Sequence, residues 1–289
     1  MCKRWVFFSI LICCFVASAL EAPEDLKPQK EPQKELHKEI KNQQKRIVSL
    51  SPHLTELTFY LGFDAQLVGV SDFSDYPLSA KSLPRVASYQ GANIAEILRL
   101  DATHVLAWDG GNKATDIAKL QSNQIPVFLS KVTSTDDLLQ DIERLGAFLG
   151  DTSGVKRQVK RLQDKIESIK ARYISSNKSV FYYLNQQPLV ALGNDPWLND
   201  LLRLCGLNNV FAHSPSAYPQ VSLEQVIRHA PELIIVANKQ DQEDFRAFWS
   251  EHHKVLDARF IQINPDKMHR FTPRAIDELD SLCQQAYTD

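Results

Sequence analysis

The sequence predicts an α/β protein made of two similar lobes joined by one long helix. Short apolar runs alternate with helical patterns over residues 46–150 and again over 175–289, which is typical of mostly parallel sheets covered by helices. Between these stretches, residues 155–173 keep a helical stripe for about five turns without Gly or Pro. Residues 95–102 also align without a gap to 224–231, and an apolar strand pattern follows each segment.

In the first lobe, residues 46–150, five apolar runs have the length of strands. These runs are Arg46–Leu50, Leu67–Ser71, Arg85–Ser88, His104–Trp108 and Pro126–Ser130. Ser51 followed by Pro52 predicts a helix start, with Ser at the N-cap and Pro at the first helical position. A second predicted helix is capped by Ser134 and ends at Gly150.

The linking helix is predicted over residues 151–174. Basic side chains occupy the faces outside its apolar stripe, which is typical of a solvated surface. In the second lobe, residues 175–289, we expect strands at Ser179–Leu184, Val190–Leu192, Leu233–Ala237 and Phe260–Ile263, separated by helices near Leu198–Leu204, Ser222–His229, Phe245–Glu251 and Pro273–Gln285.

The N-terminus predicts export. Lys3 and Arg4 precede an apolar run, Trp5–Val16, and Ala17-Ser18-Ala19 supplies an A-x-A arrangement, so residues 1–19 have the layout of a secretory signal peptide. The run is shorter than the about 20 apolar residues that span a bilayer, and an uncleaved anchor is the alternative. Residues 20–45, rich in Lys, Glu, Gln and Pro, predict a disordered charged tether.

Export leaves two cysteines in the mature chain, Cys205 and Cys283. In an oxidising compartment they allow one disulfide. In the chain-entropy model it would stabilise the fold by about 4–5 kcal/mol. Two buried free thiols are the alternative.

Charge and motifs argue against several classes of protein. The 33 Lys and Arg nearly balance the 35 Asp and Glu, so nothing indicates a nucleic-acid partner. The sequence has no nucleophile elbow, Walker loop, zinc-protease motif or dinucleotide-binding motif, and its eight histidines lack metal-ligand spacing. We therefore expect neither an enzyme nor a metal site.

Aromatic side chains recur where predicted strands end. They are Phe73, Tyr76, Tyr89 and Trp108 in the first lobe and Tyr183, Trp197 and Tyr218 in the second. Ligands of open α/β sheets lie beyond the carboxyl ends of the strands, so this recurrence suits a large, flat, partly apolar ligand. For each aromatic residue, a place in the core is the alternative.

Several motifs resemble the class III substrate-binding proteins, whose two Rossmann-like lobes are joined by a single long helix and hold a ligand in the cleft between them. These motifs are Ile47–Pro52 with Thr55-Glu56, Val68–Ser71, Ser74–Pro77 and Leu204–Phe211. Further motifs are similar to the cobalamin-binding members of this superfamily, namely Tyr89–Asn93, Ala107–Asn112, Pro219–Val226 and Arg270…Pro273-Arg274. The resemblance covers roughly residues 46–286.

The resemblance implies that a corrin ring lies between Phe73, Tyr89 and Trp108 of the first lobe and Tyr218 of the second. Phe73 stands where these proteins usually have Tyr, and Tyr89 and Tyr218 stand where they have Trp. Stacking survives such changes, but the contact area falls.

Other residues match by position. The resemblance places Asp266 and Arg270 beside the ligand, puts His269 where the family has an acid, and matches Cys205 and Cys283 to a disulfide.

The resemblance also implies docking to a permease through one exposed Glu in each lobe. Glu224 matches the second of these positions. The first position holds Ala95, and Glu96 beside it is the substitute we expect, although a shift of one residue turns the helix face by about 100°.

The implied function is a periplasmic, monomeric solute-binding protein that captures cobalamin as its transported ligand. It would deliver cobalamin to the permease subunits of an ABC importer in the inner membrane. It would have no cofactor and no nucleic-acid partner, and membrane tethering stays open. The alternatives are a haem or ferric-siderophore binding protein of the same fold, an exported chelatase-like enzyme, and a tethered module that binds a protein partner.

Overall fold

The first half of the chain builds a sheet of mostly parallel strands. The computed structural model describes residues 45–238, 248–250 and 258–288. Within these residues the first sheet has six strands in the order β4-β3-β2-β1-β5-β6, and only the β3–β4 pair is antiparallel. The strands are β1 (Ile47–Ser49), β2 (Leu67–Ser71), β3 (Arg85–Ser88), β4 (Gly91–Ala92), β5 (His104–Trp108) and β6 (Val127–Ser130).

Helices connect these strands, and their ends follow the local sequence signals. They are α2 (Pro52–Tyr60), α3 (Ile94–Arg99), α4 (Ala114–Ser122) and α5 (Thr135–Leu149). Ser134 accepts a hydrogen bond from the Asp137 N–H at the start of α5, and Gly150 ends that helix with a φ of 88°, which favours glycine. Helix α2 begins with Pro52 as predicted, but the Ser51 side chain makes no capping bond.

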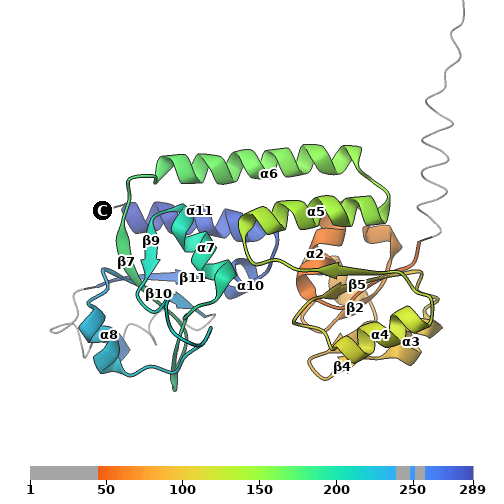
Figure 1. Cartoon of the computed structure of the whole chain (residues 1–289), viewed down its shortest axis with the longest axis horizontal. Coiled ribbons are helices and arrows are strands. Elements are labelled where there is room, and N and C mark those ends of the chain that lie inside the picture. The colour runs from red at the N-terminus through yellow and green to blue at the C-terminus, as the bar shows by residue number, and fades with distance from the viewer. Residues whose placement is uncertain (1–44, 239–247, 251–257, 289) are drawn as a thin grey trace, which may run out of the picture. The chain divides into compact units, whose positions relative to one another are not determined.

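Helix α6 (Ser153–Arg172) carries the chain from the first half to the second. Its apolar stripe is buried, and it packs against α5 and α11 (Pro273–Tyr287) (Figure 1). Ion pairs add contacts on the side of α11: Lys165 lies 2.5 Å from Asp277, and Arg172 lies 3.0 Å from Asp280. These pairs are largely exposed, so the buried stripe contributes most of the stability of this contact.

The second half repeats the α/β arrangement. Its sheet has the order β11-β10-β7-β8, with β9 paired to β7, and only the β7–β8 pair is antiparallel. The strands are β7 (Lys178–Gln186), β8 (Leu189–Ala191), β9 (Leu207–Asn209), β10 (Leu233–Ala237) and β11 (Arg259–Ile263), and the helices are α7 (Pro196–Leu204), α8 (Leu223–His229), α10 (Pro265–Met268) and α11. The two α/β lobes of the predicted fold class are thus confirmed.

One hydrophobic core extends through both halves. It includes apolar side chains of α2, α5, α6, α7 and α11 together with one face of each sheet. The opposite faces of the two sheets have separate, smaller cores. Because the shared core is close-packed, a large change in the angle between the halves would expose apolar surface.

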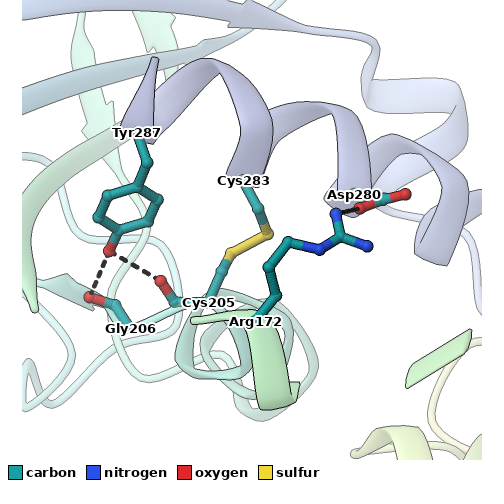
Figure 2. Close-up of a disulfide and its surroundings, with 6 residues drawn as sticks. All are labelled: Arg172, Cys205, Gly206, Asp280, Cys283 and Tyr287. Carbon is teal, nitrogen blue, oxygen red and sulfur yellow. Dashed lines mark hydrogen bonds and ion pairs between the residues drawn. A yellow bond between two sulfur atoms is a disulfide. The ribbon is translucent and has the colours of Figure 1, made fainter. Parts of the chain in front are cut away.

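The predicted disulfide is present, so the alternative of two free thiols is wrong. Cys205 follows α7, Cys283 lies in α11, and their Cα atoms are 5.8 Å apart. Both residues are fully buried. Beside them, the Tyr287 hydroxyl donates to the carbonyl oxygens of Cys205, at 2.8 Å, and Gly206, at 3.3 Å (Figure 2).

Several predictions fall on other parts of the chain. The signal peptide, 1–19, and all of the tether, 20–45, except Lys45 lie outside the described residues. The predicted helix at 245–251 is described only at 248–250, which are helical. No helix in the described part of the chain is long and apolar enough to cross a membrane.

Candidate functional site

Trp108 ends β5 and packs against both halves of the chain. Its ring makes edge-to-face contacts with His53 of α2 and with Phe271, which precedes α11, each at a centroid distance of 5.6 Å. The ring also covers the turn that follows the strand, because a Cβ on Gly111 would lie 1.8 Å from it. The Asn112 side chain fixes this turn by accepting from the Trp108 N–H and donating to the Leu50 carbonyl.

Phe271 is a residue that the sequence did not single out. Its ring lies 5.0 Å from His53 and 5.3 Å from Trp197, besides the contact with Trp108. It therefore connects aromatic rings of the first half with those of the second. The sequence signal was its place directly after Arg270.

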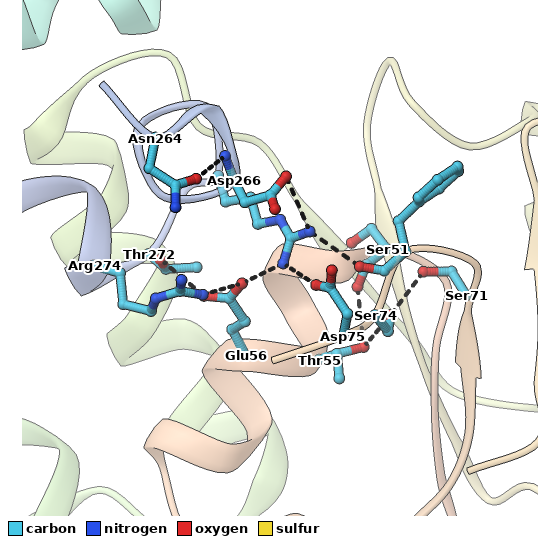
Figure 3. Close-up of polar contacts among 12 residues, drawn as sticks. Ser51, Thr55, Glu56, Ser71, Ser74, Asp75, Asn264, Asp266, Thr272 and Arg274 are labelled. Atoms are coloured by element: carbon cyan, nitrogen blue, oxygen red, sulfur yellow. Dashed lines mark hydrogen bonds and ion pairs between the residues drawn. The ribbon is translucent and has the colours of Figure 1, made fainter. Parts of the chain in front are cut away.

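A group of ion pairs, here called the Glu56 cluster, lies next to this aromatic contact and joins the two halves. It consists of Glu56, Asp75, Asp266, Arg270 and Arg274 (Figure 3). Arg270 Nη1 donates to Glu56 Oε1 at 2.7 Å and to Asp75 Oδ1 at 2.8 Å. Arg274 Nη1 donates to the same Glu56 oxygen at 2.9 Å. Glu56 thus binds two guanidinium groups of the other half.

Burial makes this cluster electrostatically strong. The Glu56 side chain is 3% exposed and that of Arg270 is 11% exposed. Burial acts to lower the pKa of Arg270, but its hydrogen bonds to Glu56 and Asp75 outweigh this effect and raise the pKa above the usual value. Arg270 therefore stays charged and held in place.

The predicted ligand residues Phe73 and Tyr89 extend into solvent from the ends of β2 and β3. Phe73 is 75% exposed and has a φ of 61°, and its carbonyl oxygen accepts from Arg270 Nη2 at 3.1 Å. Tyr89 is 88% exposed, and its hydroxyl accepts from the Gln90 amide. Exposed aromatic faces at the ends of neighbouring strands are typical of a surface that buries them on binding.

Tyr218, the predicted contribution of the second half, is held by a short hydrogen bond. Its hydroxyl donates to Asp195 Oδ2 at 2.6 Å, and the side chain is 49% exposed. Burial and the contact with Asp195 raise the pKa of Tyr218 well above its usual value. His269 lies close to the same carboxylate and accepts or donates a 2.6 Å bond with Tyr182. Burial lowers the pKa of His269 to about 4, so it is neutral near pH 7.

The structure brings together some of the predicted residues. Arg270 joins the backbone of Phe73 to the Glu56 cluster, which also contains Asp266 at 3.8 Å from Arg270. Trp108 belongs to the adjoining aromatic contact with Phe271. Tyr89 and Tyr218 have no ring contact with these residues within the described part of the chain.

Two aromatic residues that the strand-end pattern selected are core residues instead. Tyr183 lies inside β7, is fully buried and accepts from the Trp249 indole. Trp197 is buried in α7 and donates to the Met268 carbonyl. The pattern failed at Tyr183 because β7 continues to Gln186, beyond the end predicted from the apolar run.

The two predicted docking residues differ in their surroundings. Glu224 is exposed in the first turn of α8, where the helix dipole favours a carboxylate. Glu96 is 25% exposed, and its carboxylate accepts two hydrogen bonds from Arg99 one turn later. Ala95, directly before Glu96, is exposed.

A cavity of about 410 Å³ borders the Glu56 cluster on the side of α2 and α11. Its lining residues are Glu56, Phe59, Tyr60, Tyr76, Pro77, Thr272, Pro273, Arg274 and Asp277. None of the six predicted ligand residues lines it. Within the described residues, no three His, Cys, Asp or Glu side chains form a group that could hold a metal ion.

The fold, with its two α/β halves and the connecting α6, belongs to a known class of transport proteins. The chain matches the periplasmic binding protein family over residues 47–261 and is a member of it. Members of this family bind ligands and are not enzymes. Among its relatives, a protein of Yersinia pestis named vitamin B12-binding protein is 36% identical over 243 residues, covering 83% of this chain and 86% of the relative.

Solved structures show the same fold. The chain is similar to the crystal structure of the periplasmic vitamin B12 binding protein of Vibrio cholerae, with 31% identity, a TM-score of 0.75, and coverage of 83% of this chain and 95% of that one. The periplasmic haem binding protein of the same organism gives a TM-score of 0.74 at 21% identity, covering 84% and 99%. The second likeness concerns the fold alone.

Proposed function

We propose that this protein captures cobalamin in the periplasm and delivers it to an ABC importer. The observation that carries this proposal is the similarity to proteins named vitamin B12-binding protein, at 31–36% identity over 83% of the chain. The haem-binding neighbours share only the fold at lower identity. Of the two ligands named for these similar proteins, cobalamin is therefore the one that we propose for this chain.

The exposed aromatic residues support this choice of ligand. A corrin ring is large, nearly planar and apolar on its faces, so its binding would bury the rings of Phe73, Tyr89 and Tyr218, which are 75%, 88% and 49% exposed. Burial of one such ring is worth about 1–3 kcal/mol. Trp108 would border the ligand, while Asp266 and Arg270 would meet the polar side chains of the corrin.

Delivery would depend on the surface outside this site. Glu224 would pair with a cationic residue of a permease subunit, because it is exposed at a helix N-terminus. Glu96 would fill the corresponding role in the first lobe only after it releases Arg99. The protein would act as a monomer after cleavage of the signal peptide 1–19, with lobes at 46–150 and 175–289 and the linking helix at 151–174.

Isothermal titration of the purified, exported protein tests the ligand. We expect cyanocobalamin to bind with one molecule per chain, and haemin to bind much more weakly or not at all. Tight binding of haemin without binding of cyanocobalamin would instead assign the protein to haem transport. Binding of neither would leave the tethered interaction module as the better explanation.

A further inference from the structure

The cationic groups of the Glu56 cluster are all neutralised by carboxylates. Both hydrogens of Arg270 Nη1 are used by Glu56 and Asp75, and Nη2 donates to the Phe73 carbonyl and lies 3.8 Å from Asp266. Arg274 Nη1 is bound to Glu56. The cluster contains three carboxylates and two guanidinium groups, so it carries one net negative charge.

One further guanidinium lies beside the cluster, since Arg85 Nη1 donates to the carbonyl oxygens of Ser71 and Ser74, each at 3.0 Å. His53 and His269 interact electrostatically with Arg270 and Asp266, and burial lowers their pKa values to about 3 and about 4, so both are neutral near pH 7. Lys267, three residues before Arg270, is paired with Glu278 at 3.0 Å. Lys131 is paired at 3.4 Å with Asp109, which follows Trp108.

We infer that the Glu56 cluster selects corrinoids whose side chains are amides and rejects tetrapyrroles whose side chains are carboxylates. This inference rests on the proposed function and adds the groups that set its specificity, Glu56 and Asp75. Neither residue was predicted as part of the ligand site.

The selection follows from the cost of breaking the cluster. A ligand carboxylate could bind Arg270 only if Glu56 or Asp75 gave up its hydrogen bond to this guanidinium. If Glu56 gave up its bond, this buried carboxylate would lose one of the two guanidinium groups that balance its charge. The ligand charge would also be repelled by the carboxylates of Asp75 and Asp266. An amide carries no charge, and its N–H₂ can donate to the carboxylate of Asp75 or Asp266 without displacing a guanidinium. These two carboxylates are 36% and 30% exposed, so a ligand can reach them.

The two arginines of the cluster are not expected to serve an anionic ligand, for the same reason. A guanidinium recognises a carboxylate well when it is unoccupied and can form two parallel bonds. In this cluster the protein itself supplies those carboxylates. Arg270 therefore holds Asp75 and the Phe73 backbone in place beside the ligand, and its charge is balanced by carboxylates of the protein.

Two corrinoids with the same ring test this inference. Cobinamide carries amide side chains, and cobyrinic acid carries seven carboxylates on the same corrin. We expect the exported protein to bind cobinamide at least tenfold more tightly than cobyrinic acid. The substitution Asp75→Asn should reduce this ratio at least threefold, mainly by improving the binding of cobyrinic acid. Glu56→Gln should reduce the affinity ratio further. If the Glu56→Gln variant does not fold, the result with Asp75→Asn decides the outcome.

Asp280→Asn is the matched control, since it removes one carboxylate that pairs with Arg172 outside the cluster. It should leave the ratio unchanged. Equal affinities for the two corrinoids, or the same ratio in Asp75→Asn as in Asp280→Asn, would overturn the inference while the proposed function stands. Failure of cobinamide and of cyanocobalamin to bind would overturn both.

Discussion

Glu56 of α2 accepts a hydrogen bond from Arg270 Nη1 at 2.7 Å, across 214 residues of chain, and this pair joins the two halves beside the candidate site. Arg274 and the Thr272 hydroxyl bind the same carboxylate. Together with the hydrophobic core that both halves share, these contacts oppose a wide separation of the halves. Ligand capture is therefore expected to involve small adjustments of exposed loops more than a large rotation.

The carboxylate of Glu56 should be important for stability. Glu56→Ala removes the partner of two guanidinium groups that are mostly buried, and loss of one member of such a group costs about 3–5 kcal/mol. Urea unfolding should show this loss as a lower midpoint. Glu143→Ala, at an exposed position of α5, is the control and should change stability by less than about 0.5 kcal/mol. Equal midpoints for the two variants would show that the ion pairs contribute no net stability.

The disulfide should stabilise the fold strongly because it closes a long loop. Cys205 and Cys283 are separated by 78 residues, and loss of a native disulfide typically costs about 2–5 kcal/mol. The double variant Cys205→Ala with Cys283→Ala should therefore unfold at lower denaturant concentration, and reductant should shift the wild type but not the variant. An unchanged wild-type midpoint in reductant would mean that the bond contributes little.

Trp108 should contribute to ligand affinity. Trp108→Ala removes an aromatic surface that we place at the ligand, so cobalamin binding should weaken by about 1–3 kcal/mol, as measured by isothermal titration. Gly111→Ala should weaken binding as well, since its Cβ would meet the Trp108 ring and displace it. Ile174→Ala, an exposed apolar residue after α6, is the control. Normal affinity in both site variants would mean that Trp108 only packs against Phe271 and His53.

Glu224 should act in transport and not in ligand capture. Glu224→Ala should leave the cobalamin titration unchanged and slow uptake by a reconstituted importer, with a larger defect at low salt than at high salt. Glu96→Ala should have a smaller effect, because Arg99 already binds this carboxylate. A Glu224→Ala protein that loses cobalamin binding but still associates with the transporter would place this residue in the ligand site.

The fold could be predicted closely because local signals and periodicity agree. The strands at Leu67–Ser71, His104–Trp108 and Leu233–Ala237 have the predicted bounds. Helix α5 begins after Ser134, whose side chain accepts a hydrogen bond from a backbone N–H of the first turn. It ends at Gly150, whose positive φ stops the helix. The short strands β4 and β9 were not predicted, because neither Gly91–Ala92 nor Leu207–Asn209 contains an apolar run.

The candidate site was predicted less completely, for a different reason. Strand ends identified exposed aromatic residues such as Phe73 and Tyr89. The exposure of a side chain at a strand end does not require a distant partner in the sequence. Glu56 and Phe271 gain their roles from partners more than 150 residues away, and no local pattern reports such a partner. Tyr183 shows the opposite error, since an aromatic residue near a strand end is equally suited to the core.

A crystal structure of the exported protein with cyanocobalamin would test the ligand and its site together. We expect the corrin ring to lie between the halves, in contact with Phe73, Tyr89, Trp108 and Tyr218, with the Glu56–Arg270 pair intact. A corrin bound elsewhere, such as the cavity between α2 and α11, would contradict this assignment of the site.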